Sequence, residues 1–497
     1  MTILLDDHTY TKVVQTPKVL KVLSLLDKKT YKLFLKFLDS PYLNTNKKLF
    51  EFASYLFKYY PSFDNGNLSK QNLDSFLFPG TVYNRKRITD YLSDLNKKLE
   101  MFMKIETLRN NESVQKNVLI DAFDSPGLYD LFYKEIKRNS EQLKDEKVKG
   151  PNRYRLIAEL GERLLFHPEF VGKKNDEEHE MLMDVMENLD MDFAYSKLRL
   201  ITFFYSKKEF MTAEYSPNFL SLVLELSNSE FSRKHIGFKI YLDLLSLQKT
   251  SGDCMLFNRV SNLFFENSAM LSVGDRKNIF ICLANYCVKS INLELEGFVH
   301  DDLLNLYDQA LDRKILIYNG QLSDSTFNNI VIAAIRAGKF DYANSFIENY
   351  EQFLGEKIRT TAVRYCKAII CYELKNFDEA IDWLNGATKH SEIRYKIQWR
   401  YLSVKINFEK NKESSWSDYE VLESFLDSFS IFLRRNEELS SSKKSIYMDF
   451  VKFTKQLMKM HPYNRYDQAD IEKLRGTIKN SRTIGKQWLL EQLKKVG

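Results

Sequence analysis

Five basic residues in the first quarter of the chain have the type and spacing to bind phosphate. Arg85, Lys86 and Arg87 stand together where helical periodicity begins, and Lys97 and Lys98 follow within it. Positive charge at a helix N-terminus opposes the helix dipole, so helix stability does not explain the first three. If the five form one surface, it would suit nucleic-acid phosphate or another anionic partner. The alternative is an ordinary solvated surface.

The charge of the chain is unevenly distributed. The net charge is +6 over 497 residues. Residues 1–105 contain 17 Lys/Arg and 10 Asp/Glu, whereas the remainder contains 56 and 57. The basic excess is therefore a property of the N-terminal part, which would favour an acidic partner there if the excess is functional.

The other residue types capable of chemistry form no recognised local motif. The segment Asp176–Glu180 contains His179 but is not HExxH, and the seven histidines are at least twelve residues apart. The sequence also has no Gly-rich phosphate loop, no GxSxG elbow and no kinase motif. We therefore expect no metal, no cofactor and no enzymatic activity.

Cysteine usage points to a reducing compartment. The number of cysteines is odd, and no two of them form a CxxC pair. Most of them lie in apolar stretches, as buried reduced thiols do. The five are Cys254, Cys282, Cys287, Cys366 and Cys371. The start of the chain lacks the pattern of a secretory signal, and its longest apolar stretch, 279–288, is too short to span a bilayer. We predict a cytoplasmic protein without membrane insertion.

Composition and periodicity predict long helices with short connections. Gly (17) and Pro (9) are sparse, which disfavours a large sheet with many tight turns. The clearest N-terminal helix carries an apolar stripe at steps of four and three, formed by Ile88, Leu92, Leu95, Leu99 and Phe102.

Other helices are predicted from similar patterns and from breakers. A helix should begin at the Ser-x-x-acid motif of Ser24–Asp27 and stop at Ser40-Pro41. Further helices are expected at 47–60, 69–77, 126–147, 153–166, 176–188 and 191–205. Helix pairs are expected at 231–249 with 253–267, 273–291 with 301–314, and 393–410 with 416–434, before terminal helices at 437–460 and 467–495.

Two six-residue segments form an internal repeat. Gly338–Ala343 and Lys375–Ala380 match in form, lie 37 residues apart, and each joins two apolar helices. A fixed period in the thirties with two helices per unit is typical of a helical solenoid.

This segment, about 322–396, resembles tetratricopeptide repeats. The characteristic positions of that family match two successive units, formed by Ala368, Phe377, Ala380, Leu384 and Ala387 in one and by Phe340, Ala343 and Ile347 in the other. The family's Trp position holds Phe327 and Arg364, and its closing Pro is absent. The resemblance implies stacked helix hairpins that bind a peptide or helix of a partner. The first unit also resembles an RNA-reading pentatricopeptide unit, but its neighbour departs from that family's usual length.

Together these patterns predict an all-α protein with an N-terminal helical bundle and an α-solenoid of tetratricopeptide-like hairpins. The expected domains are a basic bundle (1–108), a helical connector (109–150), the solenoid (151–435) and capping helices (436–497). The Gly/Pro-terminated charged segment 144–151 is the expected linker. We predict a non-enzymatic scaffold or adaptor that binds another protein or peptide. The alternative is a nucleic-acid-associated, regulatory protein acting through its basic N-terminal domain.

Overall fold

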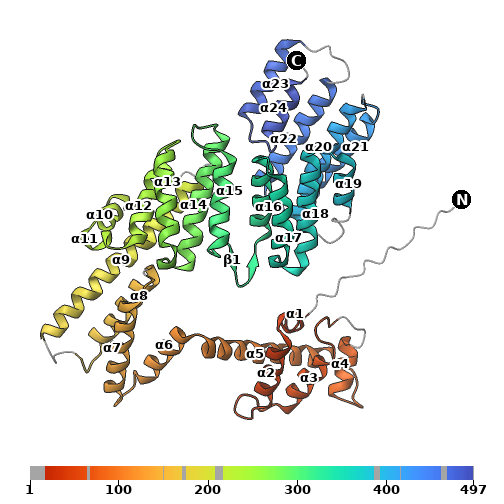
Figure 1. Ribbon diagram of the computed structural model, residues 1–497. Helices are drawn as coiled ribbons and strands as arrows, with labels where there is room; N and C mark the ends of the chain where they lie inside the picture. The colour runs from red at the N-terminus through yellow and green to blue at the C-terminus, as the bar shows by residue number, and fades with distance from the viewer. Residues whose placement is uncertain are drawn as a thin grey trace. The chain divides into compact units, whose positions relative to one another are not determined.

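The computed structural model is almost entirely α-helical over the part of the chain that it describes, which confirms the all-α prediction (Figure 1). The described residues are 17–63, 68–148, 150–170, 175–207, 216–385, 392–414, 416–460 and 467–495. None of the described helices combines the length and apolarity needed to cross a bilayer.

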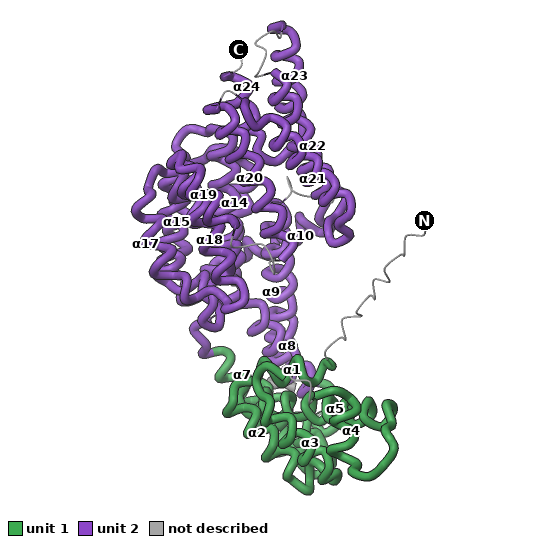
Figure 2. The backbone as a smooth tube through the Cα atoms, turned by 90° about the vertical axis from the view of Figure 1, so that its right-hand side faces the viewer, with its two compact units in different colours: residues 1–144, 166–173 green, residues 145–165, 174–497 purple. Residues whose placement is uncertain are grey.

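The chain divides into two compact units, which Figure 2 distinguishes by colour. Unit 1 comprises residues 1–144 and 166–173, and unit 2 comprises residues 145–165 and 174–497. The division at 144–145 falls within the segment expected to be a linker. His167 belongs to unit 1 because its ring packs 4.8 Å from Tyr129 and 4.9 Å from Phe132, measured between ring centroids.

Unit 1 is built around the helix with the apolar stripe. All five stripe residues of α5 are buried, as the periodicity predicts. This helix packs against α1, α2, α3 and α4, which enclose an aromatic core. The helices are α1 (Lys18–Leu25), α2 (Lys28–Asp39), α3 (Lys47–Phe57), α4 (Lys70–Leu77), α5 (Arg85–Asn110), α6 (Glu112–Phe123) and α7 (Tyr129–Asp145).

Unit 2 contains one long hydrophobic core, from Tyr154 to Ile406, and a second core from Ile397 to Leu493. Its helices are α8 (Pro151–Leu165), α9 (Asn175–Lys207), α10 (Leu220–Ser227), α11 (Glu230–Arg233), α12 (Ile236–Lys249), α13 (Cys254–Asn267), α14 (Val273–Asn292), α15 (His300–Asp312), α16 (Asp324–Arg336), α17 (Phe340–Tyr350), α18 (Glu356–Glu373), α19 (Phe377–Asn385), α20 (Ile393–Glu413), α21 (Tyr419–Arg435), α22 (Ser441–Met460), α23 (Gln468–Asn480) and α24 (Lys486–Lys494), with the short 3₁₀ turns η3 (Ser268–Met270) and η4 (Glu351–Phe353).

Consecutive helices of unit 2 pack in pairs. The pairs α12–α13, α14–α15, α16–α17, α18–α19 and α20–α21 are each in contact. The first members of neighbouring pairs also touch, because α12 contacts α14, α16 contacts α18, and α18 contacts α20. Figure 1 shows these pairs side by side along the unit. The three helix pairs expected outside the repeat are present and in contact, except that the helix expected at 231–249 is divided into α11 and α12.

The two repeat units end their first helices in the same way. Gly338 (φ +74°) and Lys375 (φ +63°) both adopt the left-handed conformation two residues after the last residues of α16 and α18. In each case the next amide donates back to a carbonyl five residues earlier, from Lys339 to Ala334 and from Asn376 to Cys371, both at 2.8 Å. This is the Schellman pattern of helix termination, which Gly adopts without strain and Lys does not.

A single two-stranded ribbon interrupts the helices within the described residues. It pairs β1 (Ile317–Tyr318) antiparallel to β2 (Gln321–Leu322). Asn319 and Gly320 form the turn with positive φ at both positions, the usual chemistry of a tight hairpin. The described residues form no larger sheet, in agreement with the scarcity of Gly and Pro.

Several predicted helix boundaries are wrong. Ser24 lies inside α1, and the next helix instead begins after Asp27, whose carboxylate accepts from the Thr30 amide at 2.8 Å. The helices predicted at 176–188 and 191–205 are one helix, α9, because no Gly or Pro stands between them. Conversely, 467–495 is two helices, and Gly485 (φ +67°) precedes the second.

All five cysteines are unpaired thiols, and all except Cys254 are buried. Burial raises the pKa of Cys282 and of Cys287 to about 12. A thiol with so high a pKa carries almost no thiolate at neutral pH, so these two residues act as small apolar side chains in the core.

Candidate functional site

Helix α20 carries a lysine into the interior of unit 2. Leu402 and Ile406 of this helix belong to the first core, whereas Val404 and Phe408 belong to the second. Because α20 packs on both sides, Lys405 is only 6% exposed. Buried lysines are rare unless they are paired.

The ammonium of Lys405 is surrounded by aromatic rings. Its Nζ lies 4.4 Å from the ring centroid of Tyr372, 5.7 Å from that of Tyr401 and 5.9 Å from that of Trp488. Ring faces attract a cation, and the attraction grows where water is excluded. Lys405 makes no hydrogen bond and no ion pair to any residue that the structure describes, so none of its three N–H donors has a protein acceptor among those residues.

Burial lowers the pKa of Lys405 to about 8. The carboxylates of Glu373, Glu491 and Glu409 act in the opposite direction, and the Arg336 guanidinium reinforces the lowering. At pH 7 the side chain therefore remains mostly protonated. The interior holds a positive charge that no described protein group neutralises through direct contact.

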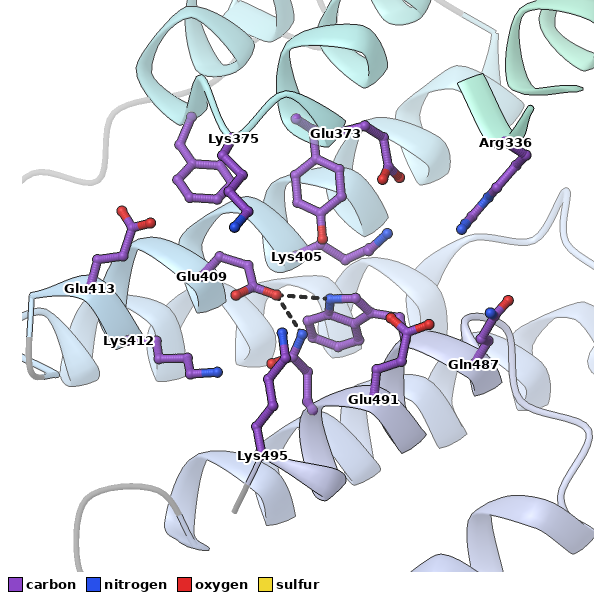
Figure 3. A pocket seen from close by; sticks show the side chains of 14 residues that line it. Arg336, Glu373, Lys375, Lys405, Glu409, Lys412, Glu413, Gln487, Glu491 and Lys495 are labelled. Atoms are coloured by element: carbon purple, nitrogen blue, oxygen red, sulfur yellow. Dashed lines mark hydrogen bonds between the residues drawn. The ribbon is translucent and has the colours of Figure 1, made fainter. Parts of the chain in front are cut away.

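Lys405 opens onto a pocket of about 550 Å³. The pocket lies between the ends of α16 and α18, the start of α19, one face of α20 and one face of α24. We call it the Lys405 pocket (Figure 3), and its lining comprises Arg336, Tyr372, Glu373, Lys375, Phe377, Lys405, Glu409, Lys412, Glu413, Gln487, Trp488, Glu491, Gln492 and Lys495. A volume in this range suits a small molecule or a few residues of a peptide.

The charged side chains of the Lys405 pocket are of both signs and are not neutralised by one another. Five are basic and four are acidic. Among them only Glu409 is hydrogen-bonded to another described residue. Burial and the nearby Lys495 ammonium also lower the pKa of Lys412. Positive charges thus lie near one another at two places in the pocket, where Arg336 is near Lys405 and Lys495 is near Lys412.

Glu409 anchors α24 against α20. Its carboxylate accepts from the indole Nε1 of Trp488 at 3.4 Å and from the amide Nε2 of Gln492 at 2.5 Å, as Figure 3 shows. The other amide atom of Gln492, Oε1, is buried and has no donor in the described part of the chain. An unsatisfied buried acceptor is costly and calls for an explanation such as a ligand.

These groups can bind a ligand that carries an anionic oxygen and an N–H donor. The anionic oxygen would accept from the Lys405 ammonium, and the N–H would donate to Gln492 Oε1. Tyr372, Phe377 and Trp488 provide apolar surface beside them. Within the described residues no cluster of three or more His, Cys, Asp or Glu side chains has the arrangement to hold a metal ion.

No protein-family model, no curated protein and no solved structure matches this chain. Its function is therefore inferred from the geometry of its own residues.

The five basic residues of unit 1 do not all face solvent freely. The Arg87 guanidinium donates to both carboxylate oxygens of Asp74, at 3.0 and 2.7 Å, and packs 4.0 Å from the centroid of the Phe78 ring. The Arg87 hydrogen bonds hold the pKa of the buried Asp74 carboxyl below its usual range. Arg87 therefore has a structural role in joining α5 to α4.

The remaining four basic residues differ in their surroundings. Lys98 donates to the Leu43 carbonyl at 2.5 Å, and Lys97 forms an exposed ion pair with Asp94 at 2.9 Å. Arg85 and Lys86, in the first turn of α5, are exposed and make no side-chain hydrogen bond or ion pair within the described residues. Of the five residues, Arg85 and Lys86 are therefore the ones whose side chains have no partner among the described residues.

The repeat positions lie in or against the first core of unit 2. Ala343, Ala368 and Ala380 are fully buried, Leu384 and Phe377 are buried, and Phe340 is partly buried. Ala387 lies outside the described residues. At the Trp position of the second unit, Arg364 instead donates to the carbonyls of Trp383 and Asp382, at 3.0 and 2.9 Å, near the C-terminus of α19.

Proposed function

We propose that the protein is a non-enzymatic scaffold or adaptor that binds a segment of another protein in the Lys405 pocket. In this proposal unit 2 is an α-solenoid of tetratricopeptide-like hairpins. The unpaired thiols fit the cytoplasmic location proposed for it.

The helix pairing of unit 2 supports a solenoid. Stacked helix pairs form a continuous surface, and each pair contributes a few exposed side chains to it. The left-handed residues Gly338 and Lys375 and the buried Ala343 and Ala380 recur at the same places in two successive pairs. A surface assembled in this way commonly receives an extended peptide or a helix.

The observation that carries the proposal is the unpaired ammonium of Lys405 in a pocket of peptide size. A polypeptide supplies both groups that the pocket lacks, because an acidic side chain provides the anionic oxygen and the backbone provides the N–H. Charges of both signs around the rim, on Arg336, Glu373, Glu413 and Lys495, would select the neighbouring side chains of that segment.

The proposal is tested by retrieving partners from native lysate with the full-length protein. The test variant is Lys405→Met, which keeps the side-chain volume and removes the charge. The matched control is Lys410→Met on the same helix, because Lys410 makes a surface ion pair with Asp378 and does not line the pocket.

We expect a partner that wild type and Lys410→Met retain equally and that Lys405→Met binds at least about tenfold more weakly. Mapping the bound segment should give an acidic residue whose replacement by its amide has a similar effect. Equal recovery of every partner by all three proteins would exclude the Lys405 pocket as the binding site.

A further inference from the structure

The stacking of helix pairs in unit 2 is interrupted between α14 and α16. The first helices of the other neighbouring pairs pack against each other, but α14 and α16 do not pack closely. The chain between them passes through α15 and the two-stranded ribbon β1–β2, which Figure 1 shows at one end of α15 and α16. A cavity of about 390 Å³ lies there, between one face of α14, the ribbon and the start of α16. We call it the ribbon pocket.

The floor of the ribbon pocket is apolar. It is formed by Phe280 of α14, Ile315 before the ribbon and Leu322 of β2, and each of these side chains is at most 5% exposed. Ile281 and Leu316 add further apolar surface to the lining. The volume is at the lower end of the range for small-molecule sites. Such a floor can take up the hydrocarbon part of a ligand through the hydrophobic effect.

The rim of the ribbon pocket carries a single charge. Among the described residues that line the pocket, Lys277 is the one that is charged. Its Nζ lies 3.8 Å from the centroid of the Tyr318 ring, and it makes no hydrogen bond or ion pair to any described residue. The ring face attracts the ammonium, but the N–H donors of Lys277 are left available to an oxygen acceptor on a ligand. The exposed amide of Gln321 also lines the pocket and is a second, neutral donor.

The acidic residues closest to the pocket along the chain are engaged elsewhere. Asp275 is buried and accepts hydrogen bonds within the core. Asp324 pairs with Arg394, and Asp312 lies near α17. None of these three acids lines the ribbon pocket, and none forms an ion pair with Lys277. The pocket therefore combines an apolar floor with a cation that no described carboxylate neutralises.

We propose that the ribbon pocket binds a small amphipathic carboxylate. The hydrocarbon part of this ligand contacts the floor, and its carboxylate accepts a charge-assisted hydrogen bond from the Lys277 ammonium. A peptide fits the pocket less well, because its backbone N–H and C=O groups would meet the apolar side chains of the floor without partners. The ribbon pocket shares no lining residue with the Lys405 pocket, so it is a second and independent site.

The test titrates the full-length protein with octanoate by isothermal calorimetry. Octylammonium and octanol are titrated in parallel, because they carry the same tail with a positive and a neutral head group. Octanoate should bind saturably, and at least about tenfold more tightly than octylammonium. Lys277→Met keeps the side-chain volume and removes the charge, so it should weaken octanoate binding by about tenfold or more and change octanol binding by less than about twofold. Lys249→Met, at an exposed lysine of α12, and Lys405→Met should both bind octanoate as wild type does.

Charge reversal gives the sharpest outcome. Lys277→Glu should shift the preference from octanoate to octylammonium, with an unchanged circular dichroism spectrum. Absence of saturable octanoate binding would overturn the proposal, as would equal octanoate binding by wild type and Lys277→Met. Loss of binding in Lys405→Met would overturn it by placing octanoate in the Lys405 pocket. Displacement of octanoate by N-acetyl-leucyl-aspartyl amide as effectively as by decanoate would overturn it in favour of a peptide site.

Discussion

Replacing Lys405 with Met should stabilise the folded protein, and the gain should depend on pH. The pKa of Lys405 falls from 10.5 to about 8 because the folded state buries the ammonium. At about 1.4 kcal/mol for each pKa unit, holding the protonated side chain in place costs the folded state about 3 kcal/mol at pH 7. Methionine fills a similar volume without a charge, so Lys405→Met removes this cost.

The sign of the pH dependence follows from the protons bound in each state. Between pH 8 and 10.5 the unfolded chain keeps the Lys405 proton while the folded protein loses it, so wild-type stability rises with pH in this interval. The advantage of Lys405→Met should therefore shrink from about 3 kcal/mol at pH 7 to about 1.5 kcal/mol at pH 9.5. Tyr372 and Tyr401 do not interfere, because burial raises the pKa of each above the range of the experiment.

Urea unfolding followed by tryptophan fluorescence measures this effect locally, because all four tryptophans lie between residues 383 and 488. Lys410→Met is the control, since its exposed ion pair is worth less than about 1 kcal/mol at either pH. Equal stability of wild type and Lys405→Met at pH 7 would refute the reasoning. A gain that stays constant up to pH 9.5 would show that packing, and not the buried charge, is responsible.

Two further substitutions test the packing of each unit. Ala380→Leu adds volume at a fully buried position and should cost about 1–3 kcal/mol in thermal melting, whereas Ala122→Leu at an exposed residue should change little. Arg87→Met leaves the buried Asp74 carboxylate without its main donors and should lower the Tm of unit 1 by roughly 5 °C or more. The neighbouring Arg85→Met should leave that Tm unchanged, and an equal effect of the two would contradict the structural role of Arg87.

The elements with regular apolar spacing could be predicted from the sequence. The stripe of α5 is one example, because in a long helix with one buried face the apolar residues recur with the period of the helix. Helix boundaries were less predictable. Ser24 and Asp27 both fit the chemistry of a helix start, and only the packing of α1 decides between them.

The Lys405 pocket could not be predicted, because its lining comes from residues 336 to 495 and meets only in the tertiary fold. One local signal was available. Lys405 stands between Val404 and Ile406 in a helix whose apolar residues follow no single face. A helix whose apolar residues lie on every side is packed on every side, which favours burial of a lysine that stands between two of them.

The buried ammonium without a protein partner among the described residues is the strongest argument that the pocket has a use. A buried charge is tolerated where it is paired, and the described residues around Lys405 offer rings but no acceptor. Methionine at the same position would satisfy packing without the cost of about 3 kcal/mol. Residues that break a local rule of folding at a cost in stability are expected at functional sites. A bound anion that pairs with Lys405 would offset the free-energy cost of burying its ammonium. The same anion would raise the pKa of Lys405 towards its ordinary value. Loss of the pH dependence in the presence of a bound partner would therefore connect the buried charge directly to the binding function.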